Sequence, residues 1–186
     1  MRELFTVIAL AVLSIPVVAQ DFQIDPKHSS ANFSVKHLMV STVRGRFGGG
    51  VTGTIHLDPK DITKSSVTAI INADTITTDN SMRDNDLKSA HFFEVDKYPE
   101  IKFQSSKVEK RGDNYVAVGN LTMKDVTKQV ELPFTLNQAD SNGKKKLGID
   151  TELGINRFDY HVNFDPSGTT VSKDVKIEIN LEANAQ

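Results

Sequence analysis

The side chains that could catalyse a reaction or hold a metal ion are histidine, cysteine and the carboxylates, and their spacing in this chain favours neither role. The chain has 5 histidines and 0 cysteines. No two histidines have the HxH or HxxxH spacing that places two imidazoles on one face of a strand or helix, so a zinc site would have to be assembled entirely across strands. Without cysteine there is neither a thiolate nucleophile nor a disulfide framework. We therefore expect no enzyme activity, no catalytic residue and no metal site.

Phosphate-binding and nucleic-acid-binding functions are also not expected. The glycine-rich residues 45–53 lack the following Lys-Ser/Thr and the helix of a phosphate-binding loop. The formal net charge is −2, and the single basic run, Lys144-Lys145-Lys146, directly follows a turn sequence. A short basic run of this kind is better explained as the solvated shoulder of a turn than as a nucleic-acid patch.

The longest stretch without a strand pattern is residues 77–103, where a charged segment gives way to the pair Phe92-Phe93. Loops of this length in compact domains are usually functional or disordered. Two adjacent Phe side chains argue against disorder, because their apolar surface has to be buried. We expect a short helix at Met82–Ser89 within a lid, at about residues 80–93, that covers one end of a β-barrel.

The residues around this helix suggest how it begins. Ser81 is the expected N-cap, with Asp84 at the third helical position as in a capping box, and Asp84 and Lys88 have the spacing of a favourable helical ion pair. Arg83 has two interpretations. It lies exposed on the helix, or it turns to the barrel rim and pairs with a polar head group or a buried carboxylate.

Alternation of apolar and polar residues dominates the rest of the chain, which is typical of antiparallel strands with one face toward a core. Roughly eight such runs are expected, at residues 31–37, 43–57, 66–76, 101–108, 115–123, 130–136, 147–155 and 175–183. Gly48-Gly49-Gly50, inside the second run, indicates a bulge or a sharp bend at a barrel corner. This spacing of strands favours a closed barrel or a sandwich made by one domain.

The inward face of these runs is apolar, and it has two interpretations. Its expected members are Phe33, Val35, Phe47, Ile71, Phe103, Leu121, Leu132, Phe134, Ile149, Ile177 and Ile179. Periodicity alone favours a solid core, because apolar faces normally pack tightly. An eight-stranded barrel is also wide enough to hold one small ligand, and the absence of Trp leaves room for a cavity without requiring one.

The beginning of the chain has the pattern of a secretory signal peptide. A weak positive charge precedes an apolar run at residues 4–13, and small or apolar residues precede a cleavage site between Ala19 and Gln20. We expect residues 1–19 to be removed and residues 20–186 to form one domain. The expected location is periplasmic or secreted.

Short motifs follow one another along nearly the whole of this domain. They are His28-Ser29, Phe33-Ser34-Val35-Lys36-His37-Leu38, Arg44-Gly45-Arg46-Phe47, Thr78-x-Asn80-x-x-Arg83-Asp84, Phe92-Phe93-x-Val95-x-x-Tyr98-Pro99-x-Ile101-x-Phe103, Gly119-x-Leu121-Thr122, Val126-Thr127-Lys128 and Ile155-x-Arg157. Each motif is weak alone, but their order and spacing are specific. Together they resemble the YceI-like polyisoprenoid-binding family.

The resemblance implies an all-β, extended, eight-stranded antiparallel lipocalin-like barrel with a helical segment near its mouth. It also implies an elongated apolar pocket for a polyisoprenoid or similar long-chain lipid, which shifts the expectation from a solid core to a cavity. The inward residues named above would bind this lipid, and Phe92 and Phe93 would close the chain inside. Our candidates for the polar end are His37, Arg83 and Arg157.

Three functions remain open at this point. The first is an exported carrier or storage protein for a polyisoprenoid lipid, with transient membrane contact, as a monomer or homodimer. The second is a redox or stress accessory protein that binds an isoprenoid quinone, which would be the bound group in place of a conventional cofactor. The third is a packed exported barrel that acts by protein–protein interaction.

The chain departs from the family pattern at two places. Lys124-Asp125 stands where the family often has His-Gly, and we expect Asp125 to adopt the left-handed conformation so that the hairpin survives. Arg157-Phe158-Asp159-Tyr160-His161 stands where the family often has Arg-Ser-x-Phe-Gly. This bulkier, more polar sequence can narrow or repolarise the mouth.

Overall fold

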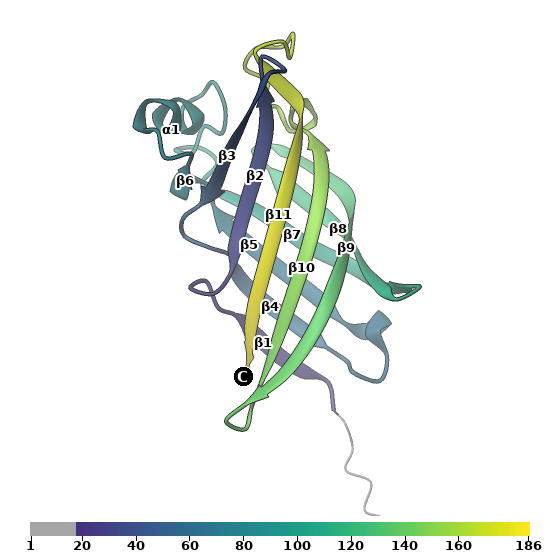
Figure 1. The fold of residues 1–186 in the computed structure, drawn as a ribbon. Coiled ribbons are helices and arrows are strands. Elements are labelled where there is room, and N and C mark those ends of the chain that lie inside the picture. Colours follow the sequence, from purple (N-terminus) through teal and green to yellow (C-terminus); the bar gives the residue numbers. More distant parts are fainter. Residues whose placement is uncertain (1–17) are drawn as a thin grey trace, which may run out of the picture.

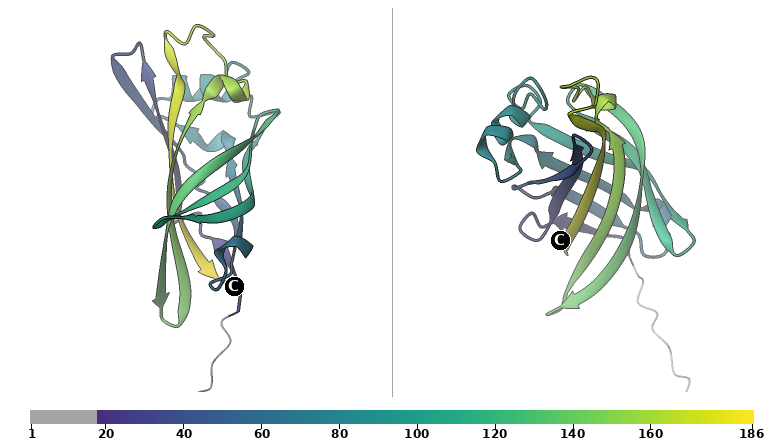
Figure 2. Two further views of the ribbon diagram at one scale, coloured as in Figure 1. Left: turned by 90° about the vertical axis from the view of Figure 1, so that its right-hand side faces the viewer. Right: turned by 45° about the horizontal axis from the view of Figure 1, so that its top comes forward.

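Strands with one apolar face bury it by curling into an elongated antiparallel barrel, as the computed structural model shows for residues 18–186 (Figures 1 and 2). The elements in chain order are β1 (Gln20–Ile24), β2 (Ser30–His37), β3 (Ser41–Phe47), β4 (Thr52–Leu57), η1 (Ile62–Lys64), β5 (Ser66–Asn72), η2 (Ala73–Thr75), β6 (Ile76–Thr77), α1 (Ser81–Lys88), β7 (Glu100–Arg111), β8 (Asn114–Met123), β9 (Val126–Ser141), β10 (Lys144–Asn156), η3 (Arg157–Tyr160) and β11 (Val171–Ala185). All but the last two residues of the expected signal peptide lie outside this description.

Eight strands form a closed ring in the order β1-β4-β5-β7-β8-β9-β10-β11, and pairing of β1 with β11 closes it. The closing edge of β11 is shared, because its end pairs with β1, as in Ile24 with Ala183, while its earlier part pairs with β2, as in Phe33 with Ile177. From β2 the sheet continues through β3 to β6. The predicted all-β, eight-stranded antiparallel barrel is thus confirmed. Within residues 18–186, no helix is long and apolar enough to cross a membrane.

The run predicted as one strand at residues 43–57 is two strands that belong to different parts of the sheet. β3 pairs with β2 and β6, whereas β4 pairs with β1 and β5. The chain turns between them at Gly50, whose φ is 68° and where a Cβ atom would lie 2.2 Å from the carbonyl oxygen of Pro26. The predicted bend at this glycine cluster is therefore present, and only glycine fits it.

The helix begins one residue earlier than predicted. Asn80, with φ of −144°, is the N-cap, and its side-chain oxygen accepts a hydrogen bond from the backbone N–H of Arg83. The predicted cap, Ser81, is the first helical residue. Asn is as good an N-cap as Ser, so the sequence offered two adjacent candidates and the backbone selected the first.

Asp84 does not form the predicted capping box. Its carboxylate instead accepts hydrogen bonds from the Thr77 hydroxyl at 2.8 Å and from the backbone N–H of Thr78 at 2.7 Å. Burial acts to raise the pKa of Asp84, but these hydrogen bonds outweigh it and hold the pKa below its usual value. The ion pair predicted between Asp84 and Lys88 is also wrong, because Lys88 pairs with Asp74 at 3.1 Å.

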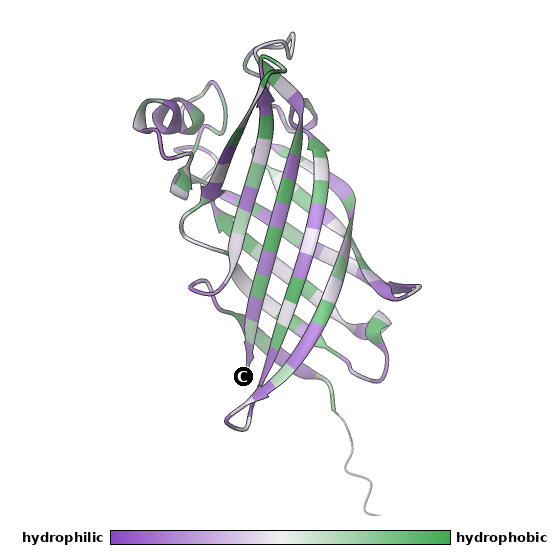
Figure 3. Ribbon diagram, in the orientation of Figure 1, coloured by the Kyte–Doolittle hydropathy of each residue, from purple (hydrophilic) through white to green (hydrophobic). Residues whose placement is uncertain are grey.

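Apolar and polar residues alternate along the strands, as the bands in Figure 3 show. Near the β1–β11 junction, Phe22, Ile24, Leu147 and Ala183 are almost completely buried, and none of them lines the cavity described below. These side chains fill the barrel at that end, and we call the opposite end, where η3 lies, the mouth.

The packing of Phe33 over a glycine yields a first prediction. Gly45 of β3 lies opposite Phe33 of β2, and a Cβ atom at Gly45 would lie 2.3 Å from the Phe33 ring. We expect Gly45→Ala to displace the ring and to lower the free energy of unfolding by ~1–3 kcal/mol. Gly154→Ala on β10 is the matched control, because a Cβ atom there would meet nothing within 4 Å. Urea unfolding followed by circular dichroism measures both, and equal effects would contradict the close approach.

Candidate functional site

The barrel encloses a cavity of about 200 Å³. A water molecule needs roughly 10–15 Å³ on this measure, so the space is far larger than a packing defect. Its wall is almost entirely apolar, and the polar residues in it are Asn32, Ser65, Ser66, Thr151 and Arg157. The solid core that periodicity alone favours is therefore wrong, and the hollow interior implied by the family resemblance is present. An apolar cavity is poorly hydrated and suits a hydrocarbon ligand.

All of the predicted ligand-binding residues except two line this cavity. They are Phe33, Val35, Phe47, Ile71, Phe92, Phe93, Phe103, Leu121, Leu132, Phe134, Ile149, Arg157, Ile177 and Ile179. The two that do not are His37 and Arg83. Alternation along the strands thus predicts the apolar residues of the wall, but it does not predict where the polar candidates lie.

Aromatic rings lead along the wall from β2 to the segment after α1. The ring centres of Phe33 and Phe47 are 6.0 Å apart, and those of Phe47 and Phe93 are also 6.0 Å apart with nearly perpendicular planes. Phe93 is held by a backbone hydrogen bond to the carbonyl of Leu87, the one residue of α1 in the cavity wall. The helix itself lies beside the barrel (Figure 1), so the predicted covering role belongs to Phe92 and Phe93 and not to α1.

Arg157 is 4% exposed, and its buried side chain holds together the segments at the mouth. Its five N–H groups all donate to backbone carbonyl oxygens, those of Val162, Phe164, Asp165, Val171 and Ser172. Arginine has five N–H donors, so none remains free for a ligand. Burial lowers the pKa of Arg157, while the nearby Asp165 acts to raise it. The head-group role predicted for Arg157 is therefore not supported, because this side chain ties the loop after η3 to the start of β11.

The other two candidates for the polar end, unlike Arg157, do not line the cavity. Arg83 is exposed on α1, where its Nε donates to the Thr78 hydroxyl at 2.7 Å and its Nη2 to the Thr78 carbonyl at 3.1 Å. Of the two interpretations of Arg83, the structure therefore shows the first, in which this side chain lies exposed on the helix. His37 ends β2, paired with Ser41 and Val171. The wall therefore presents no charged group with a free donor to a ligand.

Thr151 is the polar group of the wall that the sequence analysis missed. Within residues 18–186, its Oγ1 is the single buried side-chain polar atom that has no hydrogen-bond partner. Thr151 lies on β10 between Phe134 of β9 and Ile179 of β11. The signal was present in the sequence, since a threonine occupies an inward position in an otherwise apolar alternation. Period-two reasoning counts Thr with the β-branched residues and overlooks its hydroxyl.

The two departures from the family pattern meet in space. The predicted hairpin after β8 is present, but Lys124 adopts the left-handed conformation, with φ of 54°, and not Asp125. Lys124 Nζ donates to the carbonyl of His161, and the His161 ring lies 3.0 Å from the Asp125 carboxylate. The hydrogen bond from His161 holds the pKa of Asp125 below its usual value. The substituted residues thus form a polar bridge between the β8–β9 turn and the η3 segment.

One group of metal-ligating side chains lies outside the cavity. Ligand atoms of Asp25, His28 and Glu182 lie within 4.8 Å of one another. The His28 ring and the Asp25 carboxylate are 2.9 Å apart, and Glu182 pairs with Lys146. These side chains already have partners within the protein, and exposed acidic groups of this kind are common without a metal.

Comparison with known proteins shows the family to which the chain belongs. Residues 22–183 match the model of the YceI-like domain. The chain belongs to the YceI-like family. Protein YceI of Salmonella newport (strain SL254) is 33% identical over 98% of this chain and 96% of that protein. The Campylobacter jejuni YceI protein is 31% identical, with a TM-score of 0.73 over 81% of this chain and 90% of that one.

Two more distant structures share the YceI-like fold. BcnA of Burkholderia cenocepacia has a TM-score of 0.78 at 22% identity and covers 86% of this chain and 98% of its own. A polyisoprenoid-binding domain from Saccharophagus degradans, implicated in plant cell wall breakdown, has a TM-score of 0.69 at 15% identity and covers 89% of this chain and 98% of its own. The resemblance inferred from the motifs and the lipocalin-like architecture are thereby confirmed.

The carbonyl cluster around Arg157 yields a second prediction. Lysine has three donors on a flexible stem and cannot satisfy five carbonyls. We expect Arg157→Lys to lower the free energy of unfolding of the lipid-free protein by ~3 kcal/mol or more, because charged hydrogen bonds contribute about 1.5–3 kcal/mol each. Arg44→Lys, on an exposed part of β3, is the control and should change little. If Arg157 instead served a head group, the lipid-free protein would be unaffected.

The unpaired hydroxyl of Thr151 yields a third prediction. Thr151→Val keeps the shape and removes the buried polar atom, so we expect the lipid-free protein to become more stable by ~1 kcal/mol. Thr151→Ser keeps the hydroxyl, loses a methyl group and should be destabilising. Thermal unfolding of the two variants measures the difference, and a less stable Thr151→Val would show that the hydroxyl has a partner.

Proposed function

We propose that this protein binds a polyisoprenoid or similar long-chain lipid in its barrel cavity, as an exported carrier or storage protein and not as an enzyme. The observation that carries the proposal is the cavity itself, which is lined almost entirely by apolar side chains and closed at the β1 end. Membership of the YceI-like family and the shared fold of the polyisoprenoid-binding domain from Saccharophagus degradans support it.

The energetics of such a site favour reversible loading. Each methylene group removed from water contributes about 0.8 kcal/mol, so a forty-carbon chain would contribute roughly 30 kcal/mol. That exceeds the practical affinity limit of about 20 kcal/mol. A lipid of this length resides in a membrane, however, and the relevant comparison is between barrel and bilayer. The apolar contributions then nearly cancel, which suits a protein that collects a lipid and releases it.

The geometry favours a neutral head group over a charged one inside the barrel. The Arg157 guanidinium is fully engaged by carbonyls, and His37 and Arg83 do not reach the wall. A phosphate buried among these apolar side chains would lose its hydration without compensation. A phosphorylated lipid would therefore keep its head at the mouth, in water.

A second candidate, an isoprenoid quinone, is favoured by Thr151. Rotation about χ1 of Thr151 would turn its unpartnered hydroxyl toward the cavity, where it would donate to a carbonyl oxygen of the ligand. Quinone absorbance in the purified protein separates this candidate from a simple polyisoprenoid alcohol.

Export is part of the proposal, and the start of the barrel is compatible with it. β1 begins at Gln20, and its residues Phe22 and Ile24 are almost completely buried. Cleavage between Ala19 and Gln20 would thus remove the apolar leader and leave every strand of the barrel. The expected location remains periplasmic or secreted, as a monomer or homodimer.

Organic extraction and mass spectrometry of residues 20–186, purified without detergent, provide the fourth prediction. We expect an isoprenoid lipid in the extract, or uptake of polyprenol from vesicles if the protein is purified empty. Ile177→Trp should abolish this, because Ile177 lines the cavity between Phe33 and Leu153 and a larger ring would fill the space.

Lys176→Trp is the matched control for Ile177→Trp. Lys176 is the preceding residue of β11 and lies on the outer face, where it pairs with Glu152 and Glu178. This variant should bind lipid as the wild type does. Wild-type protein that neither contains nor takes up lipid would point to the packed barrel acting by protein contacts, and full binding by Ile177→Trp would exclude the cavity as the site.

A further inference from the structure

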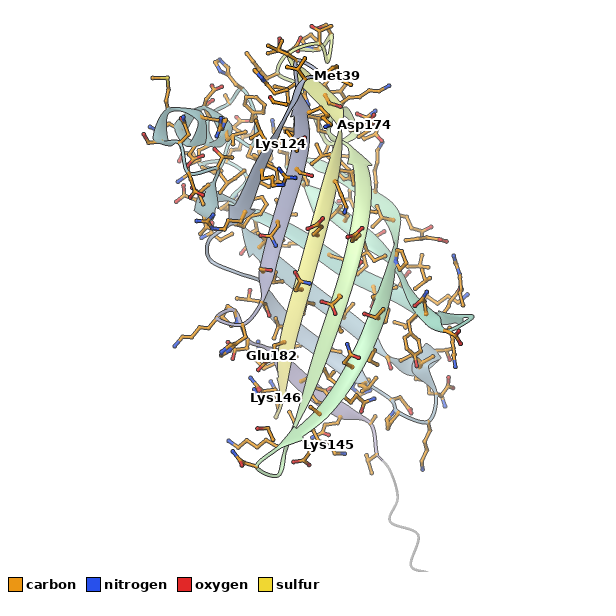
Figure 4. The ribbon with its side chains drawn as sticks, in the orientation of Figure 1. Met39, Lys124, Lys145, Lys146, Asp174 and Glu182 are labelled. Carbon is orange, nitrogen blue, oxygen red and sulfur yellow. The ribbon has the colours of Figure 1, made fainter. Side chains whose placement is uncertain are left out.

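Large apolar side chains that are exposed to solvent gather at one end of the barrel. Within residues 18–186, and apart from Val18, they are Leu38, Met39, Val40, Met82 and Phe164. The β2–β3 turn, α1 and the loop between η3 and β11 carry them, and Figure 1 shows these three segments at the same end of the molecule. Figure 4 shows Met39 near this end of the molecule and Lys145 near the opposite end.

The β2–β3 turn holds its apolar residues in a costly conformation. Leu38 and Met39 have φ of 49° and 58°, and the backbone N–H of Val40 donates to the carbonyl of His37 across them. Two successive residues with positive φ are favourable for Asn-Gly and unfavourable for large side chains, which clash with their own backbone. The β9–β10 turn of the same chain, at the opposite end, uses Asn142-Gly143 in this conformation, with φ of 57° and 74°.

Within residues 18–186, the side chains of this turn remain largely uncovered. Leu38, Met39 and Val40 are 54%, 69% and 84% exposed. A strained backbone that presents uncovered apolar side chains points to a contact outside the chain, since strain of this kind is retained where function requires it.

The charges beside the turn indicate the chemistry of that contact. Between Asp25 and Asp58 the chain has no acidic residue. The charged side chains of the β2–β3 hairpin are therefore all basic, namely Lys36, Arg44 and Arg46. Arg46 is paired with Asp79, Lys173 and Asp174 of the neighbouring β11 offset each other, and Asp165 of the adjoining loop is offset by the nearby Arg157. Lys36 and Arg44 therefore remain as the excess charge. Apolar residues at a tip with basic residues behind it match a bilayer that contains anionic lipid.

We propose that the tip formed by Leu38, Met39 and Val40 docks the barrel on an anionic membrane surface. The tip is continuous with the cavity wall. The backbone N–H of Leu38 donates to the carbonyl of Thr170, and Val35 and Val171, which flank the tip on β2 and β11, both line the cavity. Docking thus brings the mouth of the barrel to the bilayer. The transfer of a cavity lipid rests on the proposed function, whereas docking itself does not.

Co-sedimentation of lipid-free residues 20–186 with vesicles tests docking. The vesicles contain equal amounts of phosphatidylcholine and phosphatidylglycerol and no isoprenoid. We expect the wild type to bind, to bind more weakly as salt is raised, and to bind least to pure phosphatidylcholine. Replacing the tip by Leu38→Asn, Met39→Gly and Val40→Ser should weaken binding by about tenfold or more, because the apolar contact is lost.

The same tip variant should unfold at a higher urea concentration, because Asn-Gly relieves the unfavourable turn conformation. Lost binding with gained stability separates docking from damage to the fold. Met82→Ser is the control, because it removes an equally exposed apolar side chain from α1, which lies beside the barrel and outside the tip, and it should bind as the wild type does.

Three results would overturn the proposal. They are a wild type that does not bind these vesicles, a tip variant that binds unchanged, and a wild-type dimer in ultracentrifugation that the tip variant abolishes, since the tip would then serve a second copy of the chain. Because the vesicles and the protein carry no isoprenoid, each result is independent of whether the cavity binds a lipid.

Discussion

Pairing of β11 with both β1 and β2 is the constraint on which the rest of the structure depends. It closes eight strands into a ring, so that no strand of the ring has a free edge where β1 and β11 meet, and the apolar face of every strand turns inward. A chain without disulfides depends on this closure for its stability. Closure also fixes the diameter of the barrel. In an eight-stranded barrel, side chains fill the interior only where they are large or numerous enough to meet across it. In the same eight-stranded barrel, side chains therefore meet at the β1 end and leave a cavity elsewhere.

The mouth is held by polar interactions of a different kind. Arg157 donates to five backbone carbonyls, and thereby ties the loop between η3 and β11 in place. On the neighbouring side, Lys124 and Asp125 bind the segment that contains His161. A buried guanidinium without a paired carboxylate is costly, and it is retained where its donors replace hydrogen bonds that a short loop cannot make to itself. The charged groups of the mouth thus bind other groups of the protein, and Arg157, which also lines the cavity, has no donor left for a ligand.

Sequence reasoning predicted the walls well and the mouth poorly, for physical reasons. Alternation reports which face a residue occupies, so Phe33 and Ile177 were correctly placed inside. It does not report the distance across the barrel, and the family resemblance was needed to prefer a cavity. β1 was not predicted, because five residues give too short a pattern. Arg83 and Arg157, both candidates for the polar end, donate to groups of the protein itself. An arginine near a mouth serves a ligand or a carbonyl equally well, and only the geometry of the surrounding backbone decides between them.

The turns at the two ends of the barrel differ in the residues that adopt positive φ, so the two ends are not equivalent. At the Asn142-Gly143 turn, the residues suit the backbone and the neighbouring side chains are charged. At Leu38-Met39, the residues are unfavourable for the positive φ that they adopt, and their side chains are apolar. The interior differs in the same sense, since Phe22, Ile24 and Leu147 fill it near the first turn, whereas the cavity wall reaches Val35 and Val171 near the second. In the proposed function, a lipid would pass between bilayer and barrel with little change in its apolar surroundings if the Leu38–Met39 turn faced the membrane. Local strain at a single turn would then be a small cost for that placement.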